Sequence, residues 1–90
     1  MNKPAIGPAV VLSPASYNGK TGLMLCCPVT TQIKGYPFEV LIEGPRRGVV
    51  LSDQVKSVDW RARKAARKGR VTDPELAQVR GKAIALIGRP

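Results

Sequence analysis

Short apolar runs, separated by segments rich in glycine, proline and small polar residues, follow one another along most of the chain. The run "PAVVLSP" is closed by prolines, "LMLCCPV" follows a polar segment, and "FEVLIE" partly alternates between apolar and polar positions. Runs of this length bounded by turn residues are typical of β-strands. The pattern predicts strands at residues 8–14, 23–29 and 38–43, and one or two more within residues 49–60, with a break near Asp53.

The segments between these runs predict how the strands connect. Asn18 and Gly19 form the dipeptide that most strongly favours a tight hairpin, because both residues tolerate the positive φ that such a turn needs. We therefore expect the first two strands to be joined by a tight turn at Asn18–Gly19. Pro28 lacks a backbone N–H, which favours an edge strand or a strand end. Gly35 is the expected hinge of the polar loop "TTQIKGYP".

A helical pattern begins near residue 72. Thr72 and Glu75 have the spacing of a capping box, and Pro74 suits the first helical position. Asp73 is a second residue able to cap. Gly88 ends the pattern. Apolar residues recur at helical spacing and form one stripe, which consists of Leu76, Val79, Ala83 and Leu86.

These elements predict a mainly β fold with a C-terminal α-helix. The chain of 90 residues has the length of a single domain, residues 1–90. Four or five short antiparallel strands followed by a helix favour a small, curled, partly open barrel. Such a barrel has to cover its edge strands, and a homodimer would cover them.

The composition narrows the class of partner. The formal net charge is +9, and residues 61–70, "RARKAARKGR", contain no acidic residue. This balance favours a polyanionic partner such as a nucleic acid, an acidic protein or a membrane surface, and the basic run does not distinguish RNA, DNA and an acidic peptide. The chain has no histidine, so the most common general acid–base group and metal ligand is absent.

The two cysteines are adjacent and are expected to be reduced. Neighbouring side chains on a strand point to opposite faces, so Cys26 and Cys27 are poorly placed to form a disulfide with each other. We interpret them as small apolar residues that fill a strand in a cytosolic protein. The N-terminus has no signal-peptide pattern, and no stretch is long and apolar enough to predict a membrane span.

The polar residues after the second strand are candidates for a site. Thr30, Thr31 and Gln32 carry hydroxyl and amide groups that can contact bases or phosphate oxygens, although their spacing alone favours an ordinary turn. Aromatic residues leave two interpretations open. We favour a core position for Phe38 and leave open whether Tyr36 stacks on bases or packs inside. Trp60 is either a stacking platform before the basic run or a core residue.

Several blocks of the chain, in order, resemble the MazF/PemK family of toxins. They are "PAVVLSP", "CPVTTQIKGYPFEV" and "DQVKSVDWRAR", together with "SYNGKTG" and the closing "LIG". The resemblance extends over roughly residues 8–88. It implies an SH3-like barrel of the CcdB/Kid/MazF type and a homodimer. It also implies the toxin component of a type II toxin–antitoxin system.

The resemblance further implies an endoribonuclease that cuts single-stranded RNA at short motifs and so inhibits translation. The ribose 2′-hydroxyl attacks the neighbouring phosphate and leaves a cyclic phosphate and a free 5′-hydroxyl. No metal or cofactor is expected. An acidic antitoxin would block the RNA groove, and DNA would be bound only through the antitoxin complex. We expect a cytoplasmic protein without a membrane partner.

The family's site residues map onto this sequence by position. Thr30 matches the catalytic threonine that contacts the scissile phosphate. Asp53 and Gln54 match positions near the bound RNA bases. Gln32, Lys34 and Arg63 are further candidates for lining the RNA-binding site.

Two departures from the family concern the N-terminus. The family has an arginine directly before the proline of "PAVVLSP", and this chain has Gly7 there. Only the seven residues "MNKPAIG" precede "PAVVLSP" in this sequence, so the family's first strand is expected to be missing. The alternative hypothesis is therefore a truncated, catalytically impaired toxin homologue that retains dimerisation and antitoxin binding.

Overall fold

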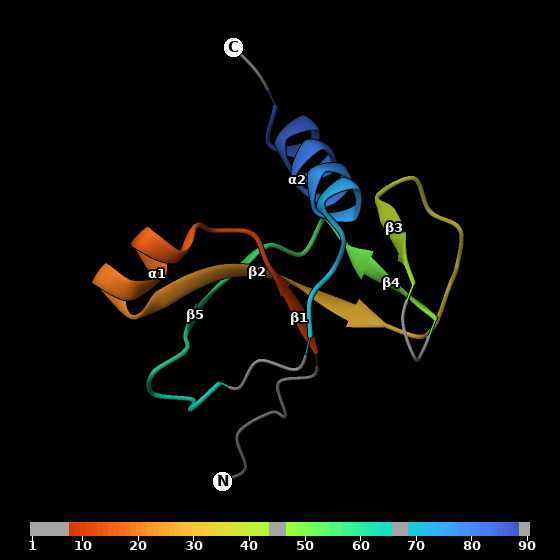
Figure 1. Cartoon of the computed structure of the whole chain (residues 1–90). Coiled ribbons are helices and arrows are strands. Elements are labelled where there is room, and N and C mark those ends of the chain that lie inside the picture. Colours follow the sequence, from red (N-terminus) through yellow and green to blue (C-terminus); the bar gives the residue numbers. More distant parts are fainter. Residues whose placement is uncertain (1–7, 44–46, 66–68, 89–90) are drawn as a thin grey trace, which may run out of the picture.

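The computed structural model describes residues 8–43, 47–65 and 69–88. Two of the expectations above concern residues outside these ranges, namely Gly7 and the expected absence of a first strand. Residues 66–68 of the basic run also lie outside the described residues. Figure 1 shows a small sheet crossed by one longer helix. Its elements are β1 (Ala9–Val11), α1 (Ala15–Thr21), β2 (Leu23–Thr30), β3 (Glu39–Ile42), β4 (Gly48–Leu51), β5 (Lys56–Asp59) and α2 (Asp73–Ile87).

The strand β2 connects all parts of the sheet. It pairs antiparallel with β1 along one edge, where Cys26 is opposite Val11. Along its other edge the first half pairs with β5 and the last two residues pair with β4. β3 then pairs with β4, which gives the path β1-β2-β4-β3 with β5 attached to β2. All of these pairings are antiparallel, as the sequence predicted.

Pro28 lies inside β2, two residues before its end, and β2 is a central strand, so the expected edge strand or strand end is wrong. The N–H of Val29 donates to the carbonyl of Pro8 (2.9 Å) and therefore faces β1. Because successive residues of a strand alternate in direction, the nitrogen of Pro28 faces the opposite edge. There the pairing with β5 has ended at Cys26 and the pairing with β4 begins at Val29. The proline thus occupies a position where the ladder needs no donor.

The predicted tight turn at Asn18–Gly19 is also wrong. β1 and β2 do pair, but the connection between them is the helix α1. Asn18 is held inside this helix, because its side chain accepts a hydrogen bond from Ser13 Oγ and donates one to the Ser13 carbonyl. The positive φ falls on Gly22 (74°), which caps α1. Neither Asn18 nor Gly19 has the positive φ that the predicted turn requires.

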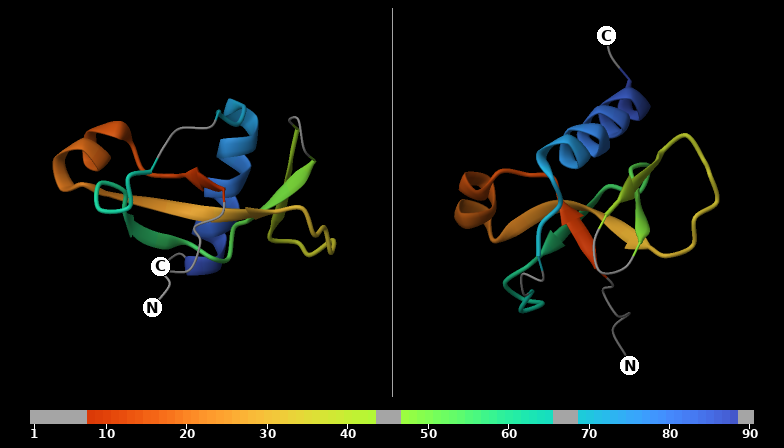
Figure 2. Two further views of the ribbon diagram at one scale, coloured as in Figure 1. Left: turned by 90° about the horizontal axis from the view of Figure 1, so that it is seen from below. Right: turned by 45° about the vertical axis from the view of Figure 1, so that its right-hand side comes forward.

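The five strands do not close into a barrel among the described residues, which corrects the closure that an SH3-like barrel implies. They form a small, bent β fold instead, and the partly open form favoured by the strand pattern is closer to what is found. The layers are visible in the two further views, where α2 crosses the sheet and α1 stands at one end of β2 (Figure 2). No helix in residues 8–43, 47–65 and 69–88 is long and apolar enough to cross a membrane.

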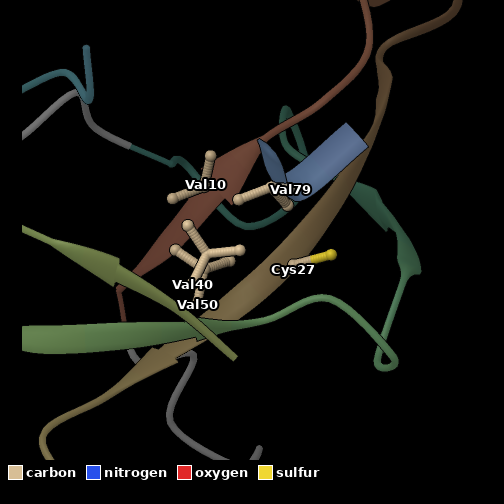
Figure 3. Packing of buried hydrophobic residues seen from close by; sticks show 5 residues of the cluster. All are labelled: Val10, Cys27, Val40, Val50 and Val79. Atoms are coloured by element: carbon tan, nitrogen blue, oxygen red, sulfur yellow. The ribbon is translucent and has the colours of Figure 1, made fainter. Parts of the chain in front are cut away.

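The core is built from small apolar side chains. Val10, Cys27, Val40, Val50 and Val79 come together from four strands and α2 (Figure 3). Both cysteines are buried and free, as expected. Burial raises the pKa of the Cys27 thiol to about 11, and Cys26 and Asp53 act in the same direction. Burial also raises the pKa of Cys26, against the opposing charge of Lys56. Both thiols are therefore protonated at neutral pH.

The predicted capping box of α2 is confirmed, with Thr72 as the cap in place of Asp73. Thr72 Oγ1 accepts from the N–H of Glu75, and the Glu75 carboxylate accepts from the N–H of Thr72 (2.8 Å). Glu75 also accepts from the N–H of Glu43 (2.9 Å), next to the end of β3. One buried carboxylate therefore caps the helix and fastens it to the sheet. Of the predicted apolar stripe, Val79 and Ala83 are buried and Leu76 packs on the core, whereas Leu86 is exposed.

Gly48 allows β4 to approach the end of β2. A Cβ atom at this position would lie 2.9 Å from the carbonyl oxygen of Thr30. Cβ atoms do not approach backbone oxygens so closely, so a larger residue would have to push the strands apart. Gly48 thereby helps to set the position of Thr30.

We predict that Glu75→Gln lowers the free energy of unfolding at pH 7 by about 1–2 kcal/mol, because hydrogen bonds to a charged acceptor are lost. The backbone hydrogen bonds of Thr72 and Glu43 lower the pKa of Glu75 in the folded state. A depressed pKa stabilises the fold above the unfolded pKa of about 4.3, and this contribution is lost as the pH falls through the folded value. The difference in the free energy of unfolding between wild type and variant should therefore shrink between pH 5 and pH 3.

Urea unfolding followed by Trp60 fluorescence measures this difference in the free energy of unfolding. Glu43→Gln, at an exposed side chain, is the matched control, and a difference that stayed constant with pH would contradict the assignment.

We predict that Gly48→Ala destabilises the protein by about 1–3 kcal/mol, the usual cost of forcing extra volume into a close contact. Gly81→Ala is the control with the opposite sign. A Cβ at Gly81 would meet no atom within 4 Å, and alanine in a helix is favoured over glycine by about 1 kcal/mol. Thermal unfolding of the two variants tests the pair, and equal effects would show that the contact at Thr30 is not tight in solution.

Candidate functional site

A pocket of about 180 Å³ lies where β2 ends and the β2–β3 loop, residues 31–38, begins. In Figures 1 and 2 this loop projects at the end of β2 that is opposite to α1. Of the six residues predicted for the site, four line the pocket. The complete lining consists of Thr30, Gln32, Lys34, Tyr36, Phe38, Glu39, Leu51 and Gln54.

Thr30 is the last residue of β2, and its hydroxyl is oriented by the backbone that follows. The N–H of Gln32 donates to Thr30 Oγ1 at 3.1 Å. Because this contact uses an acceptor position of the hydroxyl, its own proton remains available to a second group. The arrangement leaves Thr30 able to donate a hydrogen bond into the pocket, for example to a phosphate oxygen.

Tyr36 and Phe38 form an aromatic pair within the lining. Their rings are nearly parallel, with centroids 5.3 Å apart and an interplanar angle of 11°. Phe38 is half-buried and lies outside the core cluster, so the predicted core position is wrong. Tyr36 is 52% exposed, which places the pair at the surface of the pocket and not inside the sheet. A flat base could stack on such a pair.

Two further hydrogen bonds hold the lining segments together. The N–H of Ser52 donates to the carbonyl of Phe38 (3.2 Å), which ties the turn after β4 to the β2–β3 loop. Within that turn the N–H of Gln54 donates to the carbonyl of Leu51 (3.1 Å). These contacts hold the turn that carries Gln54, which lines the pocket together with Thr30 and Gln32.

Asp53 and Arg63 do not line this pocket. Asp53 is exposed in the turn between β4 and β5. Arg63 follows β5, whose Asp59 is opposite Leu23 at the beginning of β2. β2 is eight residues long and spans roughly 23 Å, so the described part of the basic run lies at the other end of the strand from Thr30. The pocket itself contains one cation and one anion, Lys34 and Glu39.

Trp60 is neither a core residue nor a free stacking platform. Its indole N–H donates to the carbonyl of Asn18 (3.0 Å), and the side chain is half-buried against α1. The guanidinium of Arg61 lies over the ring, 5.0 Å from its centroid, and also donates to the carbonyl of Gly19. These contacts fasten the segment after β5 to α1.

Sequence reasoning missed Glu39 and Leu51 as lining residues. Glu39 accepts hydrogen bonds from the N–H groups of Lys34 (3.2 and 3.3 Å to its two oxygens) and Gly35 (2.9 Å). The signal available was that the backbone donors of a polar loop need acceptors, and Glu39 is the acidic residue that directly follows this loop. In residues 8–43, 47–65 and 69–88, no group of three or more cysteine, aspartate and glutamate side chains is placed to hold a metal ion.

Comparison with known proteins identifies the family of this chain. Residues 2–87 match the family of PemK-like, MazF-like toxins of type II toxin–antitoxin systems. The chain is 60% identical over 82 residues to the endoribonuclease toxin MazF of Escherichia coli K12, which covers 90% of this chain and 74% of that protein.

Solved structures give the same result. MazF from Deinococcus radiodurans superposes with a TM-score of 0.87 at 52% identity, covering 92% of this chain and 77% of that one. A MazE–MazF structure from the same organism superposes with a TM-score of 0.87 at 51% identity, covering 93% and 83% of the two chains. The chain therefore belongs to the PemK/MazF family of toxins of type II toxin–antitoxin systems.

Proposed function

We propose that this chain is an endoribonuclease that cuts single-stranded RNA at short motifs and so inhibits translation. The observation that carries the proposal is the pocket that Thr30, Gln32, Lys34 and Gln54 line together. Thr30, Gln32 and Lys34 are close in sequence, and Gln54, at least 20 residues further along the chain, lines the same pocket.

The reaction that fits this lining is an internal transfer at phosphorus. The ribose 2′-oxygen forms a bond to the phosphorus atom while the bond from phosphorus to the 5′-oxygen breaks. The 2′-hydroxyl loses its proton and the leaving 5′-oxygen gains one, so the products are a 2′,3′-cyclic phosphate and a 5′-hydroxyl. Thr30 donates a hydrogen bond to a phosphate oxygen, and the ammonium of Lys34 offsets the negative charge that accumulates in the transition state.

The remaining lining suits recognition of bases. Gln32 and Gln54 each present an amide with donors and an acceptor, which can pair with base edges. The Tyr36–Phe38 pair offers a flat face for stacking. Asp53 and Arg63 belong to this proposal as contacts outside the pocket, and Arg63 with the basic run would hold the RNA backbone further along the strand.

The partners we propose follow from charge and exposed apolar surface. A net charge of +9 suits an acidic antitoxin, and MazF of Deinococcus radiodurans was solved together with MazE. The last turns of α2 expose Ile84, Leu86 and Ile87 (48%, 57% and 79%), and this apolar surface suits a homodimer interface. The proposed location is the cytoplasm. DNA would be bound only through the antitoxin complex.

We predict that Thr30→Ala lowers the rate of RNA cleavage by about a hundredfold to a thousandfold, because one donor to the developing charge is removed. Thr30→Ser keeps the hydroxyl and should retain most of the activity. Thr31→Ala is the matched control, since Thr31 is the neighbouring exposed threonine outside the lining. Single-turnover cleavage of a labelled RNA measures all three variants. Wild-type rates in Thr30→Ala would remove Thr30 from the catalytic role.

A second prediction concerns Gly7, where the family has arginine. We predict that Gly7→Arg raises the cleavage rate, because a guanidinium would add a second cation for the phosphate. The carbonyl of Pro8 accepts from Val29, the neighbour of Thr30, so the chain joins the sheet at the pocket end of β2. Gly7→Gln is the uncharged control. Equal rates in the two variants would contradict a role for arginine at this position.

A further inference from the structure

The Glu39 carboxylate faces the backbone of the β2–β3 loop. It accepts hydrogen bonds from two successive N–H groups, those of Lys34 and Gly35, at 2.9 to 3.3 Å. Glu39 is the first residue of β3, so the acceptor stands on the sheet while the donors belong to the loop. The same side chain lines the pocket.

A carboxylate is an unexpected lining residue for a pocket that receives phosphate, because like charges repel. The geometry resolves this difficulty. Both carboxylate oxygens are engaged by backbone N–H groups, and hydrogen bonds to an ionised acceptor are among the stronger ones in proteins. The Glu39 carboxylate therefore binds the backbone of the β2–β3 loop, and its role concerns this loop.

The loop is fixed at a second point and contains a backbone conformation that needs glycine. Lys82 on α2 donates from Nζ to the carbonyl of Pro37 (2.6 Å). Gly35 has φ +81°, a conformation that glycine adopts without strain. Between the two fixed points lies Tyr36. Lys34 belongs to the first fixed point, and Gln32 lies two residues before it. Three lining residues therefore depend on how this short segment is held.

We propose that Glu39 is a positioning residue for RNA binding: by holding the N–H groups of Lys34 and Gly35 it fixes the loop that presents Gln32, Lys34 and Tyr36. This inference rests on the proposed function, since the loop is taken to bind RNA. Lys82 acts in the same way from α2, but it holds one backbone group of the loop where Glu39 holds two.

A positioning residue, a general base and a purely structural residue at this position would each change a different measured quantity. A general base at Glu39 would act on kcat, and glutamine could not replace it. A purely structural role would lower the melting temperature and leave KM unchanged at temperatures where the variant is folded. A positioning residue raises KM with little change in kcat, and a substitution that keeps an acceptor oxygen restores part of the loss.

The experiment compares Glu39→Ala, Glu39→Gln and Lys82→Met with wild type in steady-state cleavage of a single-stranded RNA that the wild type cuts. Glu39→Ala should raise KM about tenfold or more with kcat changed less than about threefold, since misplaced binding groups reduce affinity before chemistry. Glu39→Gln should recover much of this loss, because its amide oxygen can still accept from Gly35. Lys82→Met should raise KM less. Glu43→Ala makes the same change in net charge at an exposed side chain and should leave both constants unchanged.

Amide hydrogen exchange of the same variants, followed by NMR, measures the protection of the loop N–H groups in the absence of RNA. The N–H groups of Lys34 and Gly35 should lose protection in Glu39→Ala, and Gly35 should keep it in Glu39→Gln. An unchanged KM in Glu39→Ala, or equal losses of kcat in the alanine and glutamine variants, would overturn the positioning role while the proposed function stood. Failure of the wild type to cut or bind any single-stranded RNA would instead overturn the proposed function, and this inference with it.

Discussion

The pairing of β2 with three other strands determines the rest of this small structure. β1 occupies one edge, while β5 and then β4 occupy the other, so one strand of eight residues carries both halves of the sheet. Such a strand has to be apolar on both faces, and its adjacent Cys26 and Cys27 are both buried. It also has to exchange one partner for another on the same edge. Pro28 lies where this exchange takes place, because a residue without an N–H is tolerated there. The strand ends at Thr30, and the pocket begins at that residue.

The elements with a strong local signal were predictable from the sequence. The C-terminal helix was expected from its capping box and apolar spacing, and the break near Asp53 separates β4 from β5 as predicted. The connection at Asn18–Gly19 was not, because the choice between a tight turn and α1 depends on the contacts of Asn18 with Ser13 and of Trp60 with the Asn18 carbonyl. Closure of the sheet was likewise beyond local reasoning, since it depends on which strands meet. A core position was predicted for Phe38 because aromatic residues are scarce in this chain, but its partner is the exposed Tyr36.

The candidate site shows the same division. Thr30, Gln32 and Lys34 are close in sequence, and the family resemblance already grouped them with Gln54. The sequence did not show how Gln54 comes close to Thr30, Gln32 and Lys34. The hydrogen bond from the N–H of Ser52 to the carbonyl of Phe38 holds the turn that carries Gln54 against the β2–β3 loop. Nor could the sequence separate Arg63 from the pocket, because that distance follows from the length of β2. Positive charge in this protein is therefore divided. Lys34 provides it in the pocket, and the described part of the basic run provides it at the opposite end of the strand.

The central claim is that this chain cuts single-stranded RNA by internal transfer at phosphorus. The most direct measurement is to incubate a long single-stranded RNA with the purified, folded protein and to map both ends of every product. The account predicts cuts at one recurring short motif, each leaving a 2′,3′-cyclic phosphate on the upstream fragment and a 5′-hydroxyl on the downstream fragment. Intact RNA would contradict the claim, and so would products that carry a 5′-phosphate. Intact RNA would indicate a family member whose remaining role is dimerisation or antitoxin binding, whereas 5′-phosphate products would indicate a nuclease that works by another mechanism.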